Sequence, residues 1–145
     1  MYPIEIISNI WLSDLKSLKN NKSFIRNNNI KLIVNCSLDV PYLKYMTDNI
    51  KTIRIKINDN FDTDINRLIK INESIYSNYL YKDLGVLFYC YTGSQLSPSI
   101  ISTLVLQKTK IDINDLLKSL ESKNKNINIT SNLKLFLEKY IFIKK

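Results

Sequence analysis

Residues 86–99 decide the fold of this chain, and they read Val86-Leu87-Phe88-Tyr89-Cys90-Tyr91-Thr92-Gly93-Ser94-Gln95-Leu96-Ser97-Pro98-Ser99. The first residues are apolar without alternation, which predicts a strand buried on both faces. Gly93 permits a tight turn that a side chain would resist. Ser97 and Pro98 predict a helix start, because serine caps open N–H groups and proline needs no N–H donor in a first turn.

This strand, loop and helix together predict an anion-binding cradle. In such a unit the loop N–H groups and the positive end of the helix dipole converge on one point. Cys90 lies at the mouth of the cradle, where the same groups favour a thiolate. A plain role as a small buried apolar residue is the alternative for Cys90. The cradle residues are Tyr91, Thr92, Gly93, Ser94, Gln95, Leu96 and Ser97.

The length and composition indicate a single domain over residues 1–145. No apolar run approaches the length of a membrane span, and the start Met-Tyr-Pro-Ile-Glu does not predict a signal peptide. Two cysteines and no histidine argue against a disulfide scaffold and against an ordinary zinc site. We therefore expect no metal, no cofactor and a reducing compartment, the cytoplasm.

The chain is basic, with 21 lysines and arginines against 13 acidic residues and a net charge of +8. Such a charge favours an acidic partner or nucleic acid. The abundance of Ile, Asn and Lys has a second explanation, because the codons of an A/T-rich genome favour these residues. Some large DNA viruses and parasitic protists have such genomes. Without an aromatic stacking platform or a recognised motif, nucleic acid is the less favoured partner.

Alternating strand and helix patterns predict an α/β domain with a mostly parallel central sheet of about four or five strands, flanked by helices. The predicted strands or hairpins are Ile4–Leu12, Ile30–Cys36, Ile50–Ile57 and the segment that ends at Cys90. The predicted helices are Asp14–Asn29, Asp64–Leu80, Ser97–Lys108, Ile113–Lys123 and Leu133–Phe142, and a loop with a short helix is predicted over Val40–Asn49. Sites in such folds form at the carboxyl ends of the strands, which is where Cys90 falls.

The segment 86–99 resembles the signature loop of the cysteine-dependent protein tyrosine phosphatases, specifically their dual-specificity branch. The family pattern is His-Cys, five residues, Arg and then Ser or Thr, at the end of an apolar strand. Cys90, Gly93 and Ser97 stand at matching positions. The resemblance covers the chain from about Ile4 to Tyr140. It implies the dual-specificity phosphatase fold, with Cys90 at the nucleophile position and Ser97 stabilising the leaving thiolate.

Two positions depart from this family pattern. Leu96 stands where the family has the Arg that grips phosphate through two hydrogen bonds, and a leucine donates none. The simplest role for Leu96 is to cover the core. Tyr89 stands where the family has the His beside the nucleophile, and we expect it to be half-buried with a partner for its hydroxyl. Efficient turnover is not expected.

Asp59 follows the strand Ile50–Ile57, about thirty residues before Cys90, which is the general-acid position of the resembled family. A turn-forming role fits Asp59 equally well, because it lies between two asparagines. Asp62 and Asp64 are weaker candidates for the acid, and Asp64 also fits the N-cap of the next helix.

The resemblance and its departures predict a catalytically inactive pseudophosphatase that binds or scaffolds a protein partner, either phosphorylated or acidic. A homodimer remains open. In a virus or parasite such a protein would regulate host signalling, in the host-cell cytoplasm if viral. The enzyme-class alternative is a weak or atypical phosphatase acting on phosphotyrosine, phosphoserine or phosphothreonine, in which Gln95 or a nearby lysine replaces the Arg. A plain surface role is favoured for Gln95.

The resemblance also implies that the strands ending at Cys36 and Cys90 are adjacent in the sheet. Oxidation could then join the two thiols, which requires Cα atoms within about 7 Å. Two independent buried thiols are the favoured alternative, because a reducing compartment opposes the bond.

Overall fold

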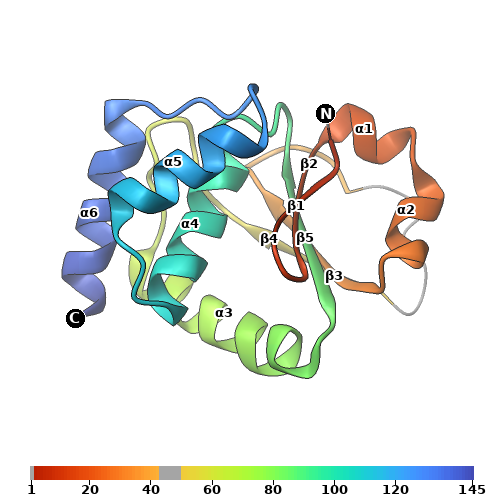
Figure 1. Ribbon diagram of the computed structural model, residues 1–145, viewed down its shortest axis with the longest axis horizontal. Coiled ribbons are helices and arrows are strands. Elements are labelled where there is room, and N and C mark those ends of the chain that lie inside the picture. Colours follow the sequence, from red (N-terminus) through yellow and green to blue (C-terminus); the bar gives the residue numbers. More distant parts are fainter. Residues whose placement is uncertain (1, 43–49) are drawn as a thin grey trace.

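The apolar segments of the sequence form one five-stranded sheet in the computed structural model, which describes residues 2–42 and 50–145 (Figure 1). The strands are β1 (Ile4–Ile7), β2 (Ile10–Asp14), β3 (Ile30–Cys36), β4 (Lys51–Ile55) and β5 (Gly85–Cys90). Their order across the sheet is β1-β2-β5-β3-β4. β1 and β2 form an antiparallel hairpin, and the other three pairings are parallel. The predicted mostly parallel α/β sheet is confirmed, with β5 at its centre.

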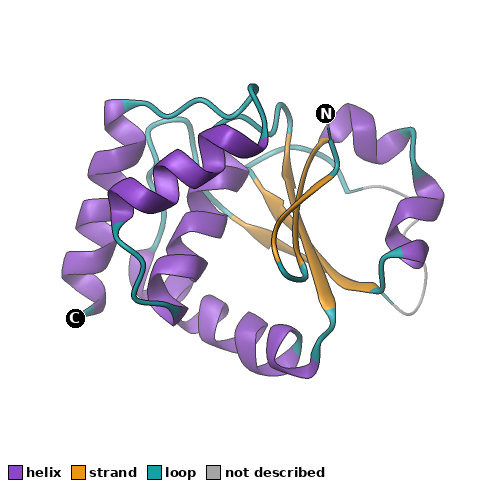
Figure 2. Ribbon diagram, viewed as in Figure 1, coloured by secondary structure: helices purple, strands orange, loops and turns teal. Residues whose placement is uncertain are grey.

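Helices cover both faces of the sheet (Figures 1 and 2). The helices on one face are α1 (Leu15–Lys19) and α2 (Lys22–Asn27). Those on the other face are α3 (Ile65–Asn78), α4 (Leu96–Lys108), α5 (Ile113–Lys123) and α6 (Ser131–Lys144), and a 3-10 turn, η1 (Leu80–Lys82), leads into β5. Side chains from Ser97 through Gln107 of α4 are all buried, so α4 is the central helix of the larger layer.

Alternation along β5 distributes its side chains between the two layers, as expected for a strand. Val86 and Phe88 belong to the larger apolar cluster, whereas Leu87 and Tyr89 belong to the smaller one beneath α1 and α2. By the same alternation Cys90 faces the layer of α4. The end of β5 therefore directs the thiol of Cys90 toward the start of the helix that follows it.

The single helix predicted over Asp14–Asn29 and the helix N-cap predicted at Ser97 are both wrong. The predicted helix Asp14–Asn29 is two short helices, because Asn20 ends α1 and Asn21 precedes α2. Asparagine has a lower helix propensity than lysine or leucine, so two in succession favour a break at this point. Ser97 is not the N-cap of α4, since the helix begins at Leu96 and Ser97 lies within its first turn. Most of the predicted loop Val40–Asn49 lies outside the described residues.

A polar network joins three helices within the larger apolar layer. The Nδ2 group of Asn72 on α3 donates to Thr103 Oγ1 of α4 at 3.0 Å and to the Tyr140 hydroxyl of α6 at 3.1 Å. The Tyr140 hydroxyl in turn donates to Gln107 Oε1 of α4. All four side chains are buried. Because these contacts cross between helices, they fix the helices relative to one another.

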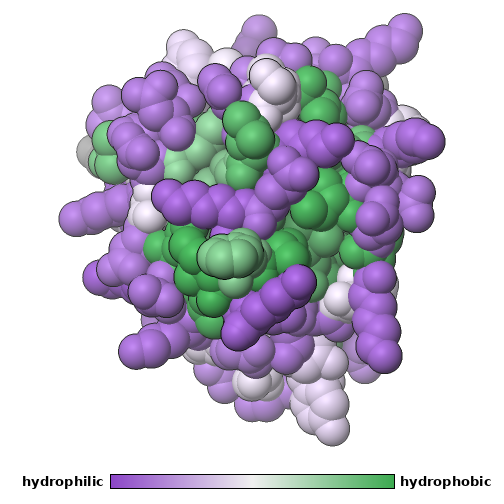
Figure 3. Space-filling view, turned by 90° about the vertical axis from the view of Figure 1, so that its left-hand side faces the viewer, coloured by the Kyte–Doolittle hydropathy of each residue, from purple (hydrophilic) through white to green (hydrophobic). Residues whose placement is uncertain are grey.

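The outward surface of α6 carries apolar side chains among charged ones, and Figure 3 shows this face of the molecule. Leu135 is 60% exposed and Phe142 is 80% exposed, while Leu133, Leu137 and Tyr140 face the core. Apolar residues thus occur on both faces of α6. In the part of the chain that the structure describes, no helix is long and apolar enough to cross a membrane.

Candidate functional site

A cavity of about 670 Å³ lies over Cys90 at the carboxyl edge of the sheet. It is lined by residues 37–40 after β3, residues 57–59 after β4, and all residues of the segment Cys90–Leu96 except Gly93. These three segments meet because β3, β4 and β5 are parallel and end at the same edge. Five of the seven cradle residues therefore line the cavity, together with Cys90 at the nucleophile position.

The signature loop wraps around the sulfur of Cys90. The Gly93 N–H donates to Cys90 Sγ at 3.2 Å, and the Ser97 N–H donates to it at 3.5 Å. The Ser97 hydroxyl lies 3.1 Å from the same sulfur. This contact, rather than helix capping, is the role that the geometry gives to the Ser97 hydroxyl. Cys90 itself is only 3% exposed, so the loop holds the thiol at the floor of the cavity.

Gly93 is required by both its backbone and its surroundings. Its φ of 69° is left-handed, and a Cβ on it would lie 2.9 Å from the ring of Tyr2. The Tyr2 hydroxyl donates to the Gly93 carbonyl oxygen at 2.6 Å. Burial raises the pKa of Tyr2, and the nearby Cys90 and Asp14 raise it further. Tyr2 thus holds the loop from outside, a role that sequence analysis missed because the two residues are far apart in the chain.

The cavity has no cationic side chain among its described lining residues. Leu96 lines the cavity at the position of the missing Arg and also packs against the larger apolar cluster, as expected of a residue that covers the core. Gln95 lines it too, as a neutral residue that is partly exposed. The charged side chains at the lining are Asp39 and Asp59, both acidic.

Arg54 on β4 supports the wall of the cavity instead of lining it. Its guanidinium donates to the Val40 carbonyl at 2.7 Å and to the Ser37 carbonyl at 3.2 Å. These bonds hold the loop after β3, which contains Asp39. The guanidinium is therefore committed to the backbone and does not replace the Arg that the signature lacks.

Tyr89 is fully buried, not half-buried as predicted, and it faces the layer opposite to that of Cys90. Its hydroxyl accepts a hydrogen bond from Asn35 Nδ2 at 3.1 Å and donates to the Pro41 carbonyl at 3.0 Å. Burial is the main cause that raises the pKa of this phenol. Tyr89 therefore supports the loop after β3 from below.

Of the three candidate acids, the structure places Asp59 at the cavity. Asp62 accepts a hydrogen bond from Asn58 Nδ2 at 3.1 Å, and Asp64 caps α3 by accepting from the Arg67 N–H at 3.1 Å. The loop is anchored by Phe61, which has a left-handed φ of 59° and a buried ring. That ring stacks on Phe136 with centroids 5.6 Å apart.

Sequence analysis missed Asp39. The signal was present, because Asp39 follows β3 by three residues and β3 was predicted as a buried strand. Polar residues just after parallel strands gather at one edge of the sheet. The carboxylates of Asp39 and Asp59 and the thiol of Cys90 thus share one cavity.

The family described as dual specificity phosphatase, catalytic domain, matches residues 10–141. The chain belongs to the dual specificity phosphatase family. The human dual specificity protein phosphatase 6 is 25% identical over 126 residues, which are 87% of this chain but 33% of that protein. The chain thus spans about a third of the length of the curated relatives that it matches.

Solved structures share the fold of this family member over nearly its whole length. Human DUSP28 superposes with a TM-score of 0.82 and 12% identity, covering 96% of this chain and 95% of that chain. The human tyrosine phosphatase-like serine/threonine/tyrosine-interacting protein gives a TM-score of 0.79 and 17% identity, covering 96% and 95%. A leucine rich repeat and phosphatase domain containing protein from Entamoeba histolytica gives 0.77 and 20%, covering 95% and 89%.

Proposed function

We propose that this chain is a pseudophosphatase, which uses the dual specificity phosphatase fold to bind a protein partner and does not hydrolyse phosphate esters. The observation that carries the proposal is Leu96, which lines the cavity where the family signature has an Arg. No described lining residue supplies a cation in its place. Phosphoryl transfer needs a fixed positive charge on the phosphoryl oxygens, and removing one such preorganised contact typically costs about 100–1,000-fold in rate.

The charge of the cavity adds to this argument. Asp39 and Asp59 would both face a bound phosphate group, and like charges close together repel. Loop N–H groups at the start of α4 remain, so we expect no more than weak binding of simple anions. In this proposal the signature loop still offers N–H groups to an anion but lacks the cation that would hold a phosphate tightly.

A binding role is supported by a protein of the same fold. One of the solved structures is described as phosphatase-like and as an interacting protein, so this fold is used in a protein of that description. We place the present chain in the same functional class, with a protein partner that is acidic or phosphorylated. The cytoplasm is the proposed compartment.

The proposal is tested by assaying hydrolysis of an aryl phosphate. The wild-type protein should show no turnover above a Cys90→Ser control. Leu96→Arg should restore measurable phosphate binding, because a guanidinium supplies a charged two-bond fork. Any turnover gained by Leu96→Arg, alone or with Tyr89→His, should vanish with Cys90→Ser and fall with Asp59→Asn.

Robust wild-type turnover that disappears in Cys90→Ser would refute the proposal and support the atypical phosphatase. Because Tyr89 is buried and bonded to Asn35 and Pro41, Tyr89→His also removes support from the loop after β3. Leu96→Arg alone is therefore the cleaner variant. Its fold is checked by circular dichroism and thermal melting before the assay.

A further inference from the structure

A second hollow of about 620 Å³ lies on the other side of the signature loop from the Cys90 cavity. Its lining includes Asp14, Lys16 and Lys19 from the start of the chain, Tyr91 and Ser94 from the signature loop, and Asn126 from the α5–α6 connection. Tyr91 and Ser94 line both spaces and therefore form the wall between them. Figure 1 shows α1, the loop after β5 and the α5–α6 connection at the same edge of the molecule.

Backbone hydrogen bonds tie both sides of this hollow to the signature loop. The Leu15 N–H donates to the Tyr91 carbonyl at 3.3 Å, which joins the start of α1 to the loop. The Asn128 N–H donates to the Ser94 carbonyl at 2.8 Å, which joins the α5–α6 connection to it. These hydrogen bonds fix both walls of the hollow relative to the signature loop. Its volume lies in the range that is typical of ligand sites.

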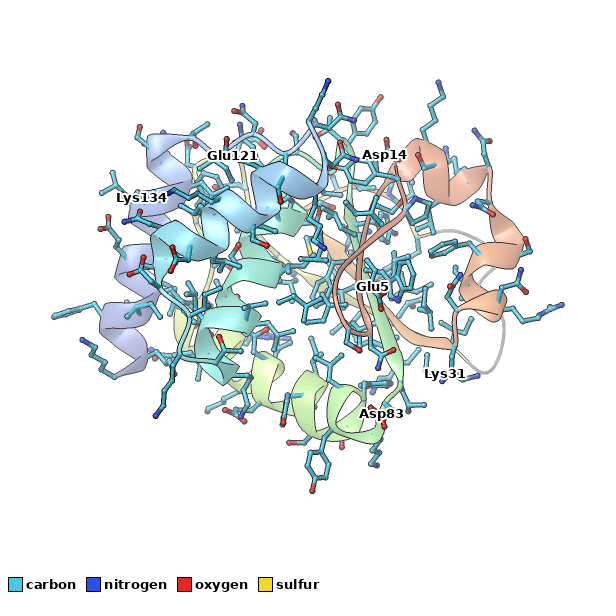
Figure 4. The ribbon with its side chains drawn as sticks, in the orientation of Figure 1. Glu5, Asp14, Lys31, Asp83, Glu121 and Lys134 are labelled. Atoms are coloured by element: carbon cyan, nitrogen blue, oxygen red, sulfur yellow. The ribbon has the colours of Figure 1, made fainter. Side chains whose placement is uncertain are left out.

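The hollow has the charge that the Cys90 cavity lacks. Lys16 and Lys19 are exposed on α1, and within the described residues neither ammonium group has an ion-pair partner. The carboxylate of Asp14 also lines the hollow, and one of its oxygens accepts the Ser17 N–H at 2.8 Å to cap α1. Figure 4 shows Asp14 where β2 leads into α1. The hollow is therefore cationic, because two lysines without ion-pair partners outweigh one carboxylate that already accepts a hydrogen bond.

An aromatic side chain stands between the two spaces. Tyr91 is 70% exposed and lines both of them. Exposed tyrosines beside charged groups are typical anchors of protein interfaces, because the ring offers contact area at a small cost in conformational entropy. A partner segment that contacts Tyr91 can therefore reach the two lysines without entering the acidic cavity.

We propose that this hollow is the docking site for an acidic, Asp- and Glu-rich segment of the protein partner, with Tyr91 as its aromatic contact and Lys16 and Lys19 as its charge contacts. The inference rests on the proposed function only in taking the partner to be a protein. Lysine ammonium groups act as point charges that suit separate carboxylates, and none of the described residues that line the hollow is an arginine, whose guanidinium fork recognises phosphate. The acidic residues at the Cys90 cavity direct such a segment to this side of Tyr91.

The test is an NMR titration of the full chain with three probes. These are a capped synthetic peptide in which glutamates flank a central leucine, the same peptide with phosphoserine in place of each glutamate, and a single-stranded DNA oligonucleotide. We expect the glutamate peptide to shift the amide signals of Lys16, Lys19, Tyr91 and Ser94 specifically. Lys16→Glu/Lys19→Glu should weaken its binding about tenfold or more, and added salt should weaken it too.

A matched control separates docking from general charge. Lys70→Glu/Lys139→Glu makes the same charge change at exposed positions on α3 and α6, and it should weaken glutamate-peptide binding by less than about twofold. Tyr91→Ala should also weaken binding while leaving the lysines in place.

Three results would overturn the docking site. These are equal weakening by the two double variants, absence of localised shifts, or binding of only the phosphoserine peptide or the oligonucleotide at these residues. None of them bears on phosphate hydrolysis. If docking fails and the wild-type protein still shows no Cys90-dependent turnover, the docking inference falls while the pseudophosphatase proposal stands.

Discussion

Leu96 stands where the family signature has an Arg, and the loop that contains it still closes around the sulfur of Cys90. Its side chain packs against the larger apolar cluster, so the substitution is accommodated by the core. The N–H groups of Gly93 and Ser97 still converge on the sulfur of Cys90. The N–H groups that surround the sulfur therefore do not depend on the side chain at position 96, which is consistent with the binding role proposed above.

At the same scale, Tyr2→Phe should loosen the signature loop. The variant keeps the ring beside Gly93 and removes the hydroxyl that donates to the Gly93 carbonyl oxygen. A buried acceptor that loses its donor typically costs about 1–3 kcal/mol. We expect that loss in urea unfolding, together with faster hydrogen exchange of the Ser94 amide, which belongs to the same peptide unit.

Tyr91→Phe is the matched control, because it removes a hydroxyl from a ring that is exposed on the same loop. It should leave both the unfolding free energy and the Ser94 exchange rate nearly unchanged. Identical behaviour of the two variants would show that Tyr2 does not hold the loop.

At the scale of elements, the ends of β3 and β5 bring the two cysteines together. Asn35 pairs with Tyr89 in the parallel register, so Cys36 and Cys90 follow as the next residues on adjacent strands. Parallel strands lie about 4.8 Å apart, which is within the Cα separation that a disulfide allows. Both thiols are free and buried, and burial together with the nearby Cys90 raises the pKa of Cys36.

We therefore expect peroxide treatment to produce a Cys36–Cys90 disulfide, detected by mass spectrometry of an unreduced digest. Cys90 is expected to react first, because burial keeps Cys36 protonated. Cys36→Ser should prevent the linkage and leave Cys90 open to further oxidation. If both thiols of the wild-type protein can still be alkylated after peroxide, the two cysteines are independent.

The elements themselves differ in how well the sequence predicts them. The boundaries predicted for β3 and α5 are correct, because an uninterrupted apolar run and a regular leucine stripe each leave one interpretation. The segment Asp14–Asn29 was predicted as one helix, since its apolar spacing continues across the Asn20–Asn21 break. The end of α6 was also placed too early, because its apolar residues face both the core and the solvent.

Across the whole molecule, functional residues that are close together in the chain are easier to identify from the sequence than residues that only the fold brings together. The signature segment could be singled out from its local pattern, and Asp59 from its position in the family resemblance. Tyr2, Asp39 and the hollow beside Lys16 required the three-dimensional arrangement, because their contacts join segments that are far apart in sequence. The acidic charge of the Cys90 cavity arises because the fold brings these segments together, and no single motif contains it.

The whole fold should lose stability in alkali. Burial raises the pKa of Tyr140 to about 12 and also raises the pKa values of Tyr2 and Tyr89. The unfolded chain ionises its tyrosines near pH 10, so the stabilisation is complete below that pH and is lost as pH rises toward the folded values. One pKa unit corresponds to about 1.4 kcal/mol, so Tyr140 alone accounts for a loss on the order of 2–3 kcal/mol.

Urea unfolding at a series of pH values from 8 to 12, with tyrosinate absorbance read in parallel, measures this loss. Tyr140→Phe should be less stable at pH 8, because it breaks the network with Asn72 and Gln107, but its stability should decline less steeply in alkali. A decline of equal slope in the two proteins would contradict the role given to Tyr140.

The hydrogen bonds that join α3, α4 and α6 also limit how such a protein can diverge over generations. Replacing Asn72 alone removes the donor that the buried Thr103 and Tyr140 hydroxyls share, and replacing Tyr140 alone removes a donor to Gln107. Each single substitution therefore passes through a sequence that is less stable than either the present polar set or a fully apolar one. A lineage that carries this network can exchange it for a hydrocarbon interior only when several mutations arrive together, so these positions should be inherited as a group.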